Sequence, residues 1–153
     1  MHTTLNSLMT VQTRSVCILD YDWLYELHRD VYIEVITRQF GNWDEKEQLN
    51  FFQDVWRSHN ITVIIIDKEP VGMFQLYQHE DHLWLAEIQI ATKYQNNGIG
   101  TKVIVDLITK ARKIGLPLRL RVLNENHRAQ SLYQRLGFRH IKATRHHHLM
   151  EVD

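Results

Sequence analysis

The sequence is poor in cysteine, proline and glycine, and each shortage limits what the chain can be. Cys17 is the only cysteine among 153 residues, which excludes an internal disulfide and disfavours a thiolate metal site. We expect this thiol to lie buried, as a small apolar side chain. Two prolines, six glycines and no low-complexity tract or repeat give no sign of a linker. The length therefore predicts a single domain over residues 1–153.

Long apolar runs and an excess of charge are also missing. Polar and apolar residues alternate from Met1 to Ser15, so neither a secretory signal nor a membrane-spanning helix is predicted. A cytoplasmic protein without a membrane partner is expected. The formal net charge is zero, which argues against a nucleic-acid partner.

The two halves of the chain nevertheless differ in charge. Between Asp20 and Asp54 there are nine acidic residues and three basic ones, whereas Lys93–Arg145 holds twelve Lys and Arg against Asp106 and Glu125. A basic half suits a polyanionic cofactor, and an acidic half suits a cationic acceptor. Ordinary solvated helix faces explain the same pattern equally well.

Four helices are predicted from apolar residues spaced three and four apart. The first follows Asp20 and Asp22 and ends at Gly41, and the second opens at Asp44. The third begins at Gly98–Gly100, and the fourth ends at Gly137. The buried faces are expected to hold Leu24, Leu27, Val31 and Val35; Leu49, Phe52, Val55 and Trp56; Ile99, Val103, Ile104, Leu107, Ile108 and Ala111; and Ala129, Leu132, Tyr133 and Leu136.

Seven strands are predicted between and around these helices. Six are residues 9–16, 61–66, 71–79, 83–90, 138–143 and 146–151, and the seventh alternates Leu118, Leu120 and Val122 with two arginines. Residues 67–70 are expected to form the turn between the second and third strands. The predicted order is β-αα-βββ-α-β-α-ββ, an α/β (α+β) class.

The segment Gln95-Asn96-Asn97-Gly98-Ile99-Gly100 lies at a strand-to-helix junction. Gly98 lets the main chain pass close to a ligand, and the amides that open the next helix favour an anion. The segment is neither a dinucleotide fingerprint nor a P-loop. Taken alone, it also fits a plain helix start.

Two motifs together resemble the GNAT superfamily of N-acetyltransferases. Gln95, Gly98 and Gly100 match its Gln/Arg-x-x-Gly-x-Gly/Ala cofactor motif. Its later segment is matched by Asn126, Ala129, Leu132-Tyr133 and Leu136-Gly137-Phe138. The similarity is concentrated between about Leu83 and Phe138. It implies the GNAT fold, a mixed and mostly antiparallel sheet of about seven strands flanked by four helices.

The resemblance also implies acetyl-CoA as the acyl donor. In this family the fourth and fifth strands splay, and the pantetheine arm bonds along the main chain of the fourth, here Ile88, Gln89 and Ile90. The family's pyrophosphate residues correspond to Gln95, Asn96, Asn97, Gly98, Ile99, Gly100 and Thr101. Asn126 is implied to reach the pantetheine, and Lys93 and Lys102 to meet remaining phosphate charge.

Two side chains are candidates for catalysis. Tyr133 matches the family tyrosine that lies beside the sulfur and protonates the departing thiolate; a core tyrosine is the alternative. An alkylammonium acceptor, with a reference pKa of about 10.4, must lose a proton before it attacks. Glu87, which interrupts an apolar strand, is the candidate base, directly or through water. Pairing with a neighbouring arginine is the alternative for Glu87.

The acceptor site is expected at the loop between the first two helices. Residues 40–45 look like a Phe-Gly-Trp-Asp-Glu phrase of small bacterial GNAT proteins, with Asn42 as an extra residue. The candidate substrate-binding residues are Tyr25, His28, Trp43, Asp44 and Glu45. A capped helix start, with Trp43 packed as a hydrophobic staple, explains the same loop.

The predicted reaction is direct attack of a small-molecule or peptide amine on acetyl-CoA in a ternary complex. Cys17 lies outside both motifs, which disfavours an acyl-enzyme. A non-catalytic acyl-CoA-binding regulatory module is the alternative. His146-His147-His148 suggests a metal site, but adjacent strand residues face opposite sides, so none is predicted. Members of the family are often dimers, so a homodimer is considered.

Overall fold

The computed structural model describes residues 10–153. The chain divides into two compact units. The first runs to Gln75 and includes Glu87–Gly100, and the second holds Leu76–Ala86 and Thr101–Asp153. Within the described residues, no helix has the length and apolar character needed to cross a membrane.

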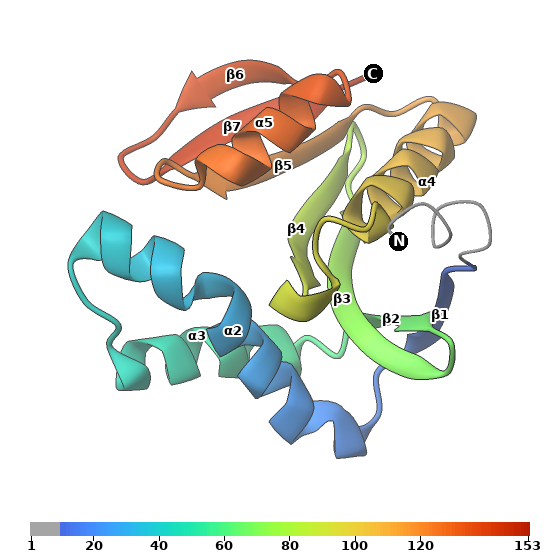
Figure 1. Cartoon of the computed structure of the whole chain (residues 1–153). Helices are drawn as coiled ribbons and strands as arrows, with labels where there is room; N and C mark the ends of the chain where they lie inside the picture. Colours follow the sequence, from blue (N-terminus) through green and yellow to red (C-terminus); the bar gives the residue numbers. More distant parts are fainter. Residues whose placement is uncertain (1–9) are drawn as a thin grey trace. The chain divides into compact units, whose positions relative to one another are not determined.

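Seven strands of the described chain form one sheet in the order β1-β2-β3-β4-β5-β7-β6 (Figure 1). They are β1 Gln12–Ser15, β2 Thr62–Ile66, β3 Glu69–Gln78, β4 Leu83–Ile90, β5 Leu118–Leu123, β6 Arg139–Ala143 and β7 His147–Val152. The helices are α2 Tyr21–Phe40, α3 Glu45–Arg57, α4 Ile99–Ile114 and α5 His127–Arg135, with 3-10 turns η1 Ile18–Asp20 and η2 Thr92–Tyr94. The predicted order of elements is confirmed.

In the first unit, helix α2 ends and helix α3 begins where the sequence predicts. Gly41 adopts φ +89° at the end of α2, and its amide donates to the Thr37 carbonyl. The Asp44 side chain accepts from the Glu47 amide and caps α3. Both helices contribute to one core, which contains Leu24, Leu27, Phe52, Ile61 and Met73.

The turn between β2 and β3 is shorter than predicted. Only Asp67 and Lys68 form it, with φ of 49° and 68°, and β3 already begins at Glu69. Pro70 lies inside this strand, opposite Ile65 and next to a register shift between Ile64 and Ile65. A proline has no amide to donate to the ladder, and a bulge is one of the few strand positions that accept it.

Cys17 is exposed, so the prediction of a buried thiol is wrong. The residue precedes η1, where its amide donates to Asp20 Oδ2 at 2.8 Å. Asp20 also pairs with both terminal nitrogens of Arg14, at 2.7 and 2.8 Å. The Arg14 guanidinium lowers the pKa of Asp20 to about 2. The polar turn thus uses the Cys17 main chain and leaves its side chain outside the core.

Helix α4 buries all six residues of its predicted apolar face. In the second unit, β5 buries Leu118, Leu120 and Val122 while Arg119 and Arg121 face away, as alternation predicts. The parallel ladder between β4 and β5 joins Leu83–Leu85 to Leu118–Leu120. Residues 87–90 of β4 therefore lie beyond the end of this ladder.

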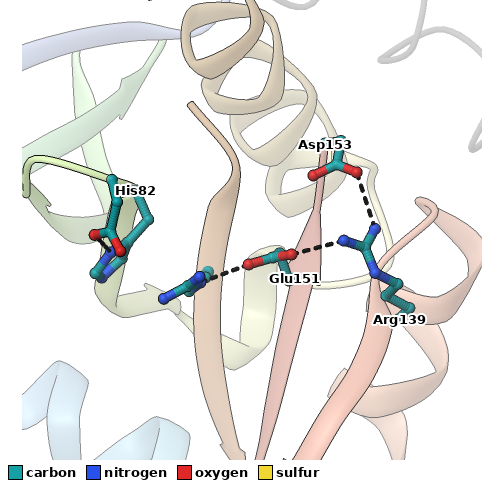
Figure 2. A network of polar contacts seen from close by, with 6 residues as sticks. His82, Arg139, Glu151 and Asp153 are labelled. Atoms are coloured by element: carbon teal, nitrogen blue, oxygen red, sulfur yellow. Dashed lines mark hydrogen bonds and ion pairs between the residues drawn. The ribbon is translucent and has the colours of Figure 1, made fainter. Parts of the chain in front are cut away.

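An ion-pair network joins the three C-terminal strands. Glu151 of β7 is opposite Arg119 of β5 and Arg139 of β6 in the two registers. Its carboxylate contacts Arg119 Nε at 2.5 Å and Arg139 at 2.7 Å, and Arg139 also reaches Asp153 at 3.2 Å. Figure 2 shows Glu151 facing Arg139, which in turn faces Asp153. Glu151 is only 8% exposed, so two guanidinium groups depend on one buried carboxylate.

We predict that Glu151→Gln lowers the free energy of unfolding by about 1 to 3 kcal/mol, because the two arginines lose their shared charged acceptor. Asp153→Asn is the control, since its exposed pair should contribute less than about 1 kcal/mol. Urea unfolding of both variants measures the difference. Equal losses in the two variants would show that the buried Glu151 carboxylate stabilises the fold no more than the exposed Asp153 carboxylate does.

A second prediction concerns pH. Burial, together with Arg121 and His146, lowers the pKa of His147 to about 4, below the ordinary value of 6.5. As the pH falls, the unfolded chain binds this proton before the folded chain does. The stability contributed by neutral His147 is complete above about pH 6.5 and is lost towards pH 4. Unfolding midpoints at pH 7 and 4.5 should differ less in His147→Gln than in wild type, with exposed His79→Gln as the control.

Candidate functional site

The end of strand β4 presents a buried polar pair in the first unit. Burial alternates along β4, so Glu87 and Gln89 face the interior and Ile88 and Ile90 face the other side. Glu87 is 9% exposed and Gln89 is 4% exposed. Gln89 Nε2 donates to Glu87 Oε2 at 3.2 Å. Glu87, the candidate base, therefore lies on the strand to which the pantetheine arm is assigned, on the face opposite to that of Ile88 and Ile90.

Tyr32 of α2 is a residue that the sequence analysis missed. Its hydroxyl donates to Glu87 Oε2 at 2.6 Å. The two residues are 55 positions apart, so no local motif links them. Tyr32 does follow Tyr25 and His28 at helical spacing, which places all three on one side of α2 and is the signal that was available.

Gly72 of β3 is a second missed residue. A Cβ atom at this position would overlap the carbonyl oxygen of Gln89 and lie 2.9 Å from Ile90 Cδ1. The Ala91 amide also donates to the Val71 carbonyl at 2.9 Å. The main chains of β3 and β4 thus approach closely where the pantetheine arm is expected, and only glycine permits this approach.

Side-chain hydrogen bonds hold the segment after β4. Asp30 of α2 accepts from the amide and the hydroxyl of Thr92, each at 2.8 Å. Gln95 Nε2 donates to the Ile90 carbonyl at 2.8 Å, and Asn97 Nδ2 donates to the Tyr94 carbonyl at 3.3 Å. The predicted Gln95 and Asn97 side chains therefore hold the loop's own main chain.

The loop backbone alternates in hand before α4 begins. Asn96 has φ +67° and Gly98 has φ +79°, whereas Asn97 between them does not have a positive φ. Such alternation turns successive amides into a concavity that suits an anion. Ile99, Gly100 and Thr101 open α4, where the first amides have no acceptor within the helix. The residues present fit a pyrophosphate.

The two lysines expected near the phosphates have partners of their own. Lys93 Nζ lies 5.1 Å from the centre of the Tyr94 ring. Lys102 pairs with Asp106 at 3.0 Å, one helical turn along α4. Lys102 thus shares its charge with a carboxylate, and Lys93 lies against an aromatic ring.

Asn126 and Tyr133 belong to the second unit. Asn126 caps α5, because its Oδ1 accepts from the Ala129 amide at 3.2 Å. Tyr133 is 7% exposed, and its ring packs 5.6 Å from that of Phe138. Asn124, which the sequence analysis passed over, has a buried Oδ1 with no hydrogen-bond partner among the described residues.

The predicted acceptor residues gather around one carboxylate. Glu45 accepts from the Tyr25 hydroxyl at 2.8 Å and from Trp43 Nε1 at 2.6 Å. These two bonds lower the pKa of Glu45, while burial and the Glu45 contact raise the pKa of Tyr25 to about 12. Glu45 thus stays charged and Tyr25 stays neutral at pH 7. Asp44 is used as the cap of α3.

His28 lies behind this group. It is 2% exposed, its Nε2 is 2.9 Å from Gln48 Oε1, and burial lowers its pKa. The rings of Trp43 and Tyr32 lie 5.7 and 5.1 Å from its own. His28 is therefore neutral at pH 7 and packs against these aromatic rings. No group of three or more potential metal ligands occurs among the described residues.

A family model identifies the family of this chain. The acetyltransferase (GNAT) family model matches residues 22–138, most of the chain. The chain belongs to the GNAT family. It is accordingly an acetyltransferase with acetyl-CoA as the acyl donor, as the two sequence motifs predicted.

Solved structures share the GNAT fold at low identity. PaiA N-acetyltransferase from Thermoplasma acidophilum, in complex with coenzyme A, has a TM-score of 0.75 and 19% identity over 94% of this chain and 98% of its own. The ribosomal-protein-S18-alanine N-acetyltransferase of Escherichia coli has a TM-score of 0.67 and 18% identity over 94% and 93%. A domain from Methanocaldococcus jannaschii has a TM-score of 0.74 and 21% identity over 94% and 98%. A search of curated proteins gave no match.

The loop backbone supports a sharp test. Gly98→Ala should weaken acetyl-CoA binding about tenfold, because a left-handed backbone costs a side chain about 1 to 2 kcal/mol. Gly100→Ala should change affinity less than about threefold, since its Cβ would lie 3.7 Å from Ile90 Cγ1, an ordinary contact. Calorimetry measures both constants. Equal weakening by the two variants would contradict the assigned role of the Gly98 backbone.

Proposed function

We propose that this GNAT protein transfers the acetyl group of acetyl-CoA to a primary amine by direct attack within a ternary complex. The observation that carries the proposal is that one strand and the loop after it hold two features. These are a buried, hydrogen-bonded Glu87 and the Ile90–Gly100 segment, which is held by the Gln95 side chain. Acetyl-CoA supplies an activated acyl group. The remaining steps are assigned to side chains and main chain of this protein.

The donor is proposed to bind mainly through the main chain. Amides of the Asn96–Gly100 loop and of α4 would hold the pyrophosphate, and the main chain of Ile88–Ile90 would align the arm and polarise the thioester carbonyl. The buried Oδ1 of Asn124 supports a further contact, because it accepts no hydrogen bond from the described residues. The Asn126 amide group is assigned to the pantetheine by the family motif.

Glu87 is proposed as the base that accepts a proton from the acceptor amine, and Tyr133 as the acid that protonates the departing thiolate. The surroundings of each residue support its proposed role. The Glu87 carboxylate is held by Tyr32 and Gln89, and the Tyr133 phenol is buried. Burial limits exchange with water, so each proton moves along a defined path. Cys17, exposed beside η1, is given no part.

The acceptor is proposed to be a cationic amine recognised by Tyr25, Trp43 and Glu45. The Glu45 carboxylate supplies the counter-charge, and the two rings supply faces for an alkylammonium chain. Both hydrogen-bond donors to Glu45 are neutral, so its charge is not cancelled by them. His28 would act by supporting Trp43, and Asp44 by starting α3.

A turnover screen tests the proposed function. Purified protein is incubated with acetyl-CoA and a library of primary amines, amino acids, peptides with free N-termini and lysine peptides, and CoA release is measured. Glu87→Gln should lower kcat about 100-fold or more, and Tyr133→Phe about tenfold or more. Cys17→Ser should retain full activity, since direct attack needs no thiol.

Each outcome of the screen has a distinct meaning. Inactive Cys17→Ser would favour an acyl-enzyme over direct attack. Unchanged activity in both Glu87→Gln and Tyr133→Phe would remove the two side-chain roles. Calorimetric binding of acetyl-CoA without turnover of any amine would replace the enzyme by an acyl-CoA-binding module.

A further inference from the structure

Glu87 is a base that substrate does not reach easily. The carboxylate is about nine-tenths buried, and its Oε2 atom already accepts from Tyr32 and Gln89. An acceptor amine arriving from solvent therefore needs an intermediary to deliver its proton to this oxygen. The shorter of the two bonds, 2.6 Å from the Tyr32 hydroxyl, identifies the group next to the carboxylate.

Tyr32 is placed to be that intermediary. It is half-buried and thus more exposed than Glu87, and its hydroxyl contacts the buried carboxylate. It lies seven residues after Tyr25, two helical turns along the same side of α2. Tyr25 in turn holds Glu45, the proposed counter-charge of the acceptor. One helix face thus connects the acceptor residues with the base.

A hydroxyl also has the chemistry that a relay requires. A phenol oxygen accepts one hydrogen bond while its proton is donated elsewhere, whereas Gln89 offers Glu87 only an amide donor. Tyr32 donates to the carboxylate in the structure, so its proton already points at Glu87 Oε2.

We propose that Tyr32 is a catalytic proton relay between the acceptor amine and Glu87. The inference rests on the proposed function. The ammonium gives a proton to the Tyr32 oxygen as the Tyr32 proton moves to Glu87 Oε2, so Tyr32 ends neutral. The amine lone pair then forms the C–N bond as the C–S bond breaks, and the sulfur leaves with that bonding pair as a thiolate. The new amide nitrogen loses its surplus proton, and the thiolate takes up one proton, so the products are a neutral amide, CoA thiol and protonated Glu87.

The test compares Tyr32→Phe with Tyr21→Phe, a matched control on the same helix whose ring packs against Phe52 and Trp56. Primary alkylamines serve as probes, with kcat and KM measured from pH 6 to 10. Tyr32→Phe should lower kcat/KM about 100-fold at pH 7. The deficit should shrink about tenfold per pH unit, to below about threefold near pH 10, because free amine becomes abundant near its pKa of about 10.4. Tyr21→Phe should follow wild type throughout.

Two further readouts separate a relay from a structural role. Tyr32→Phe should bind acetyl-CoA within about twofold of wild type by calorimetry, because the hydroxyl has no part in donor binding. Trifluoroethylamine, which is unprotonated at neutral pH, should be acetylated at nearly equal rates by both proteins. If Tyr32→Phe fails to fold, 3-fluorotyrosine at position 32 replaces it; a relay predicts a changed kcat at pH 7, and an unchanged kcat contradicts it.

The outcomes distinguish the relay from the function on which it rests. A wild-type protein that releases no CoA with any amine overturns both. An active wild type whose pH profile is unaltered in Tyr32→Phe overturns the relay alone. A loss of rate that is equal at every pH and with trifluoroethylamine also overturns the relay, since it shows a structural defect.

Discussion

The candidate site of the first unit depends on one carboxylate, Asp30 of α2, which holds the amide and hydroxyl of Thr92. Thr92 opens η2 directly after β4, so this contact fixes the strand end against the helix that carries Tyr32. Only Val31 separates Asp30 from Tyr32, and one helical turn therefore secures both the segment after β4 and the hydrogen bond to Glu87. A shift of α2 would disturb the loop and the base together.

The carboxylates of this protein fall into two groups by the charge of their hydrogen-bond donors. Asp20 and Glu151 bind arginines, which cancel their charge and make them structural. Asp30, Glu45 and Glu87 receive the bonds described above from neutral hydroxyl, amide and indole groups. Neutral donors orient a carboxylate without neutralising it, so these side chains retain attraction for a cation. Within the acidic segment from Asp20 to Asp54, Glu45 is thus the carboxylate that we propose to meet a cationic acceptor.

The sequence predicted features that depend on neighbours along the chain and missed those that depend on distant ones. Helical periodicity found the whole buried face of α4, and local caps located the ends of α2 and α3. The contacts of Glu87 with Tyr32 and of Asp30 with Thr92 span 55 and 62 residues, beyond any motif. Gly72 gave a usable signal, because a glycine inside a strand often marks a close backbone approach. Cys17 was misplaced because composition alone does not show that a turn exposes its side chain.

The family motif describes the construction of the loop more than its contacts with ligand. Gln95 holds the Ile90 carbonyl, Asn97 holds Tyr94, and Asn126 caps α5, so all three side chains bind main chain of their own unit. Their common effect is to fix backbone amides in place. A phosphate bound by amides is recognised through shape and dipole, which lysine charge cannot replace. Under the proposed function, Lys102 can therefore be engaged by Asp106 without loss of an essential donor.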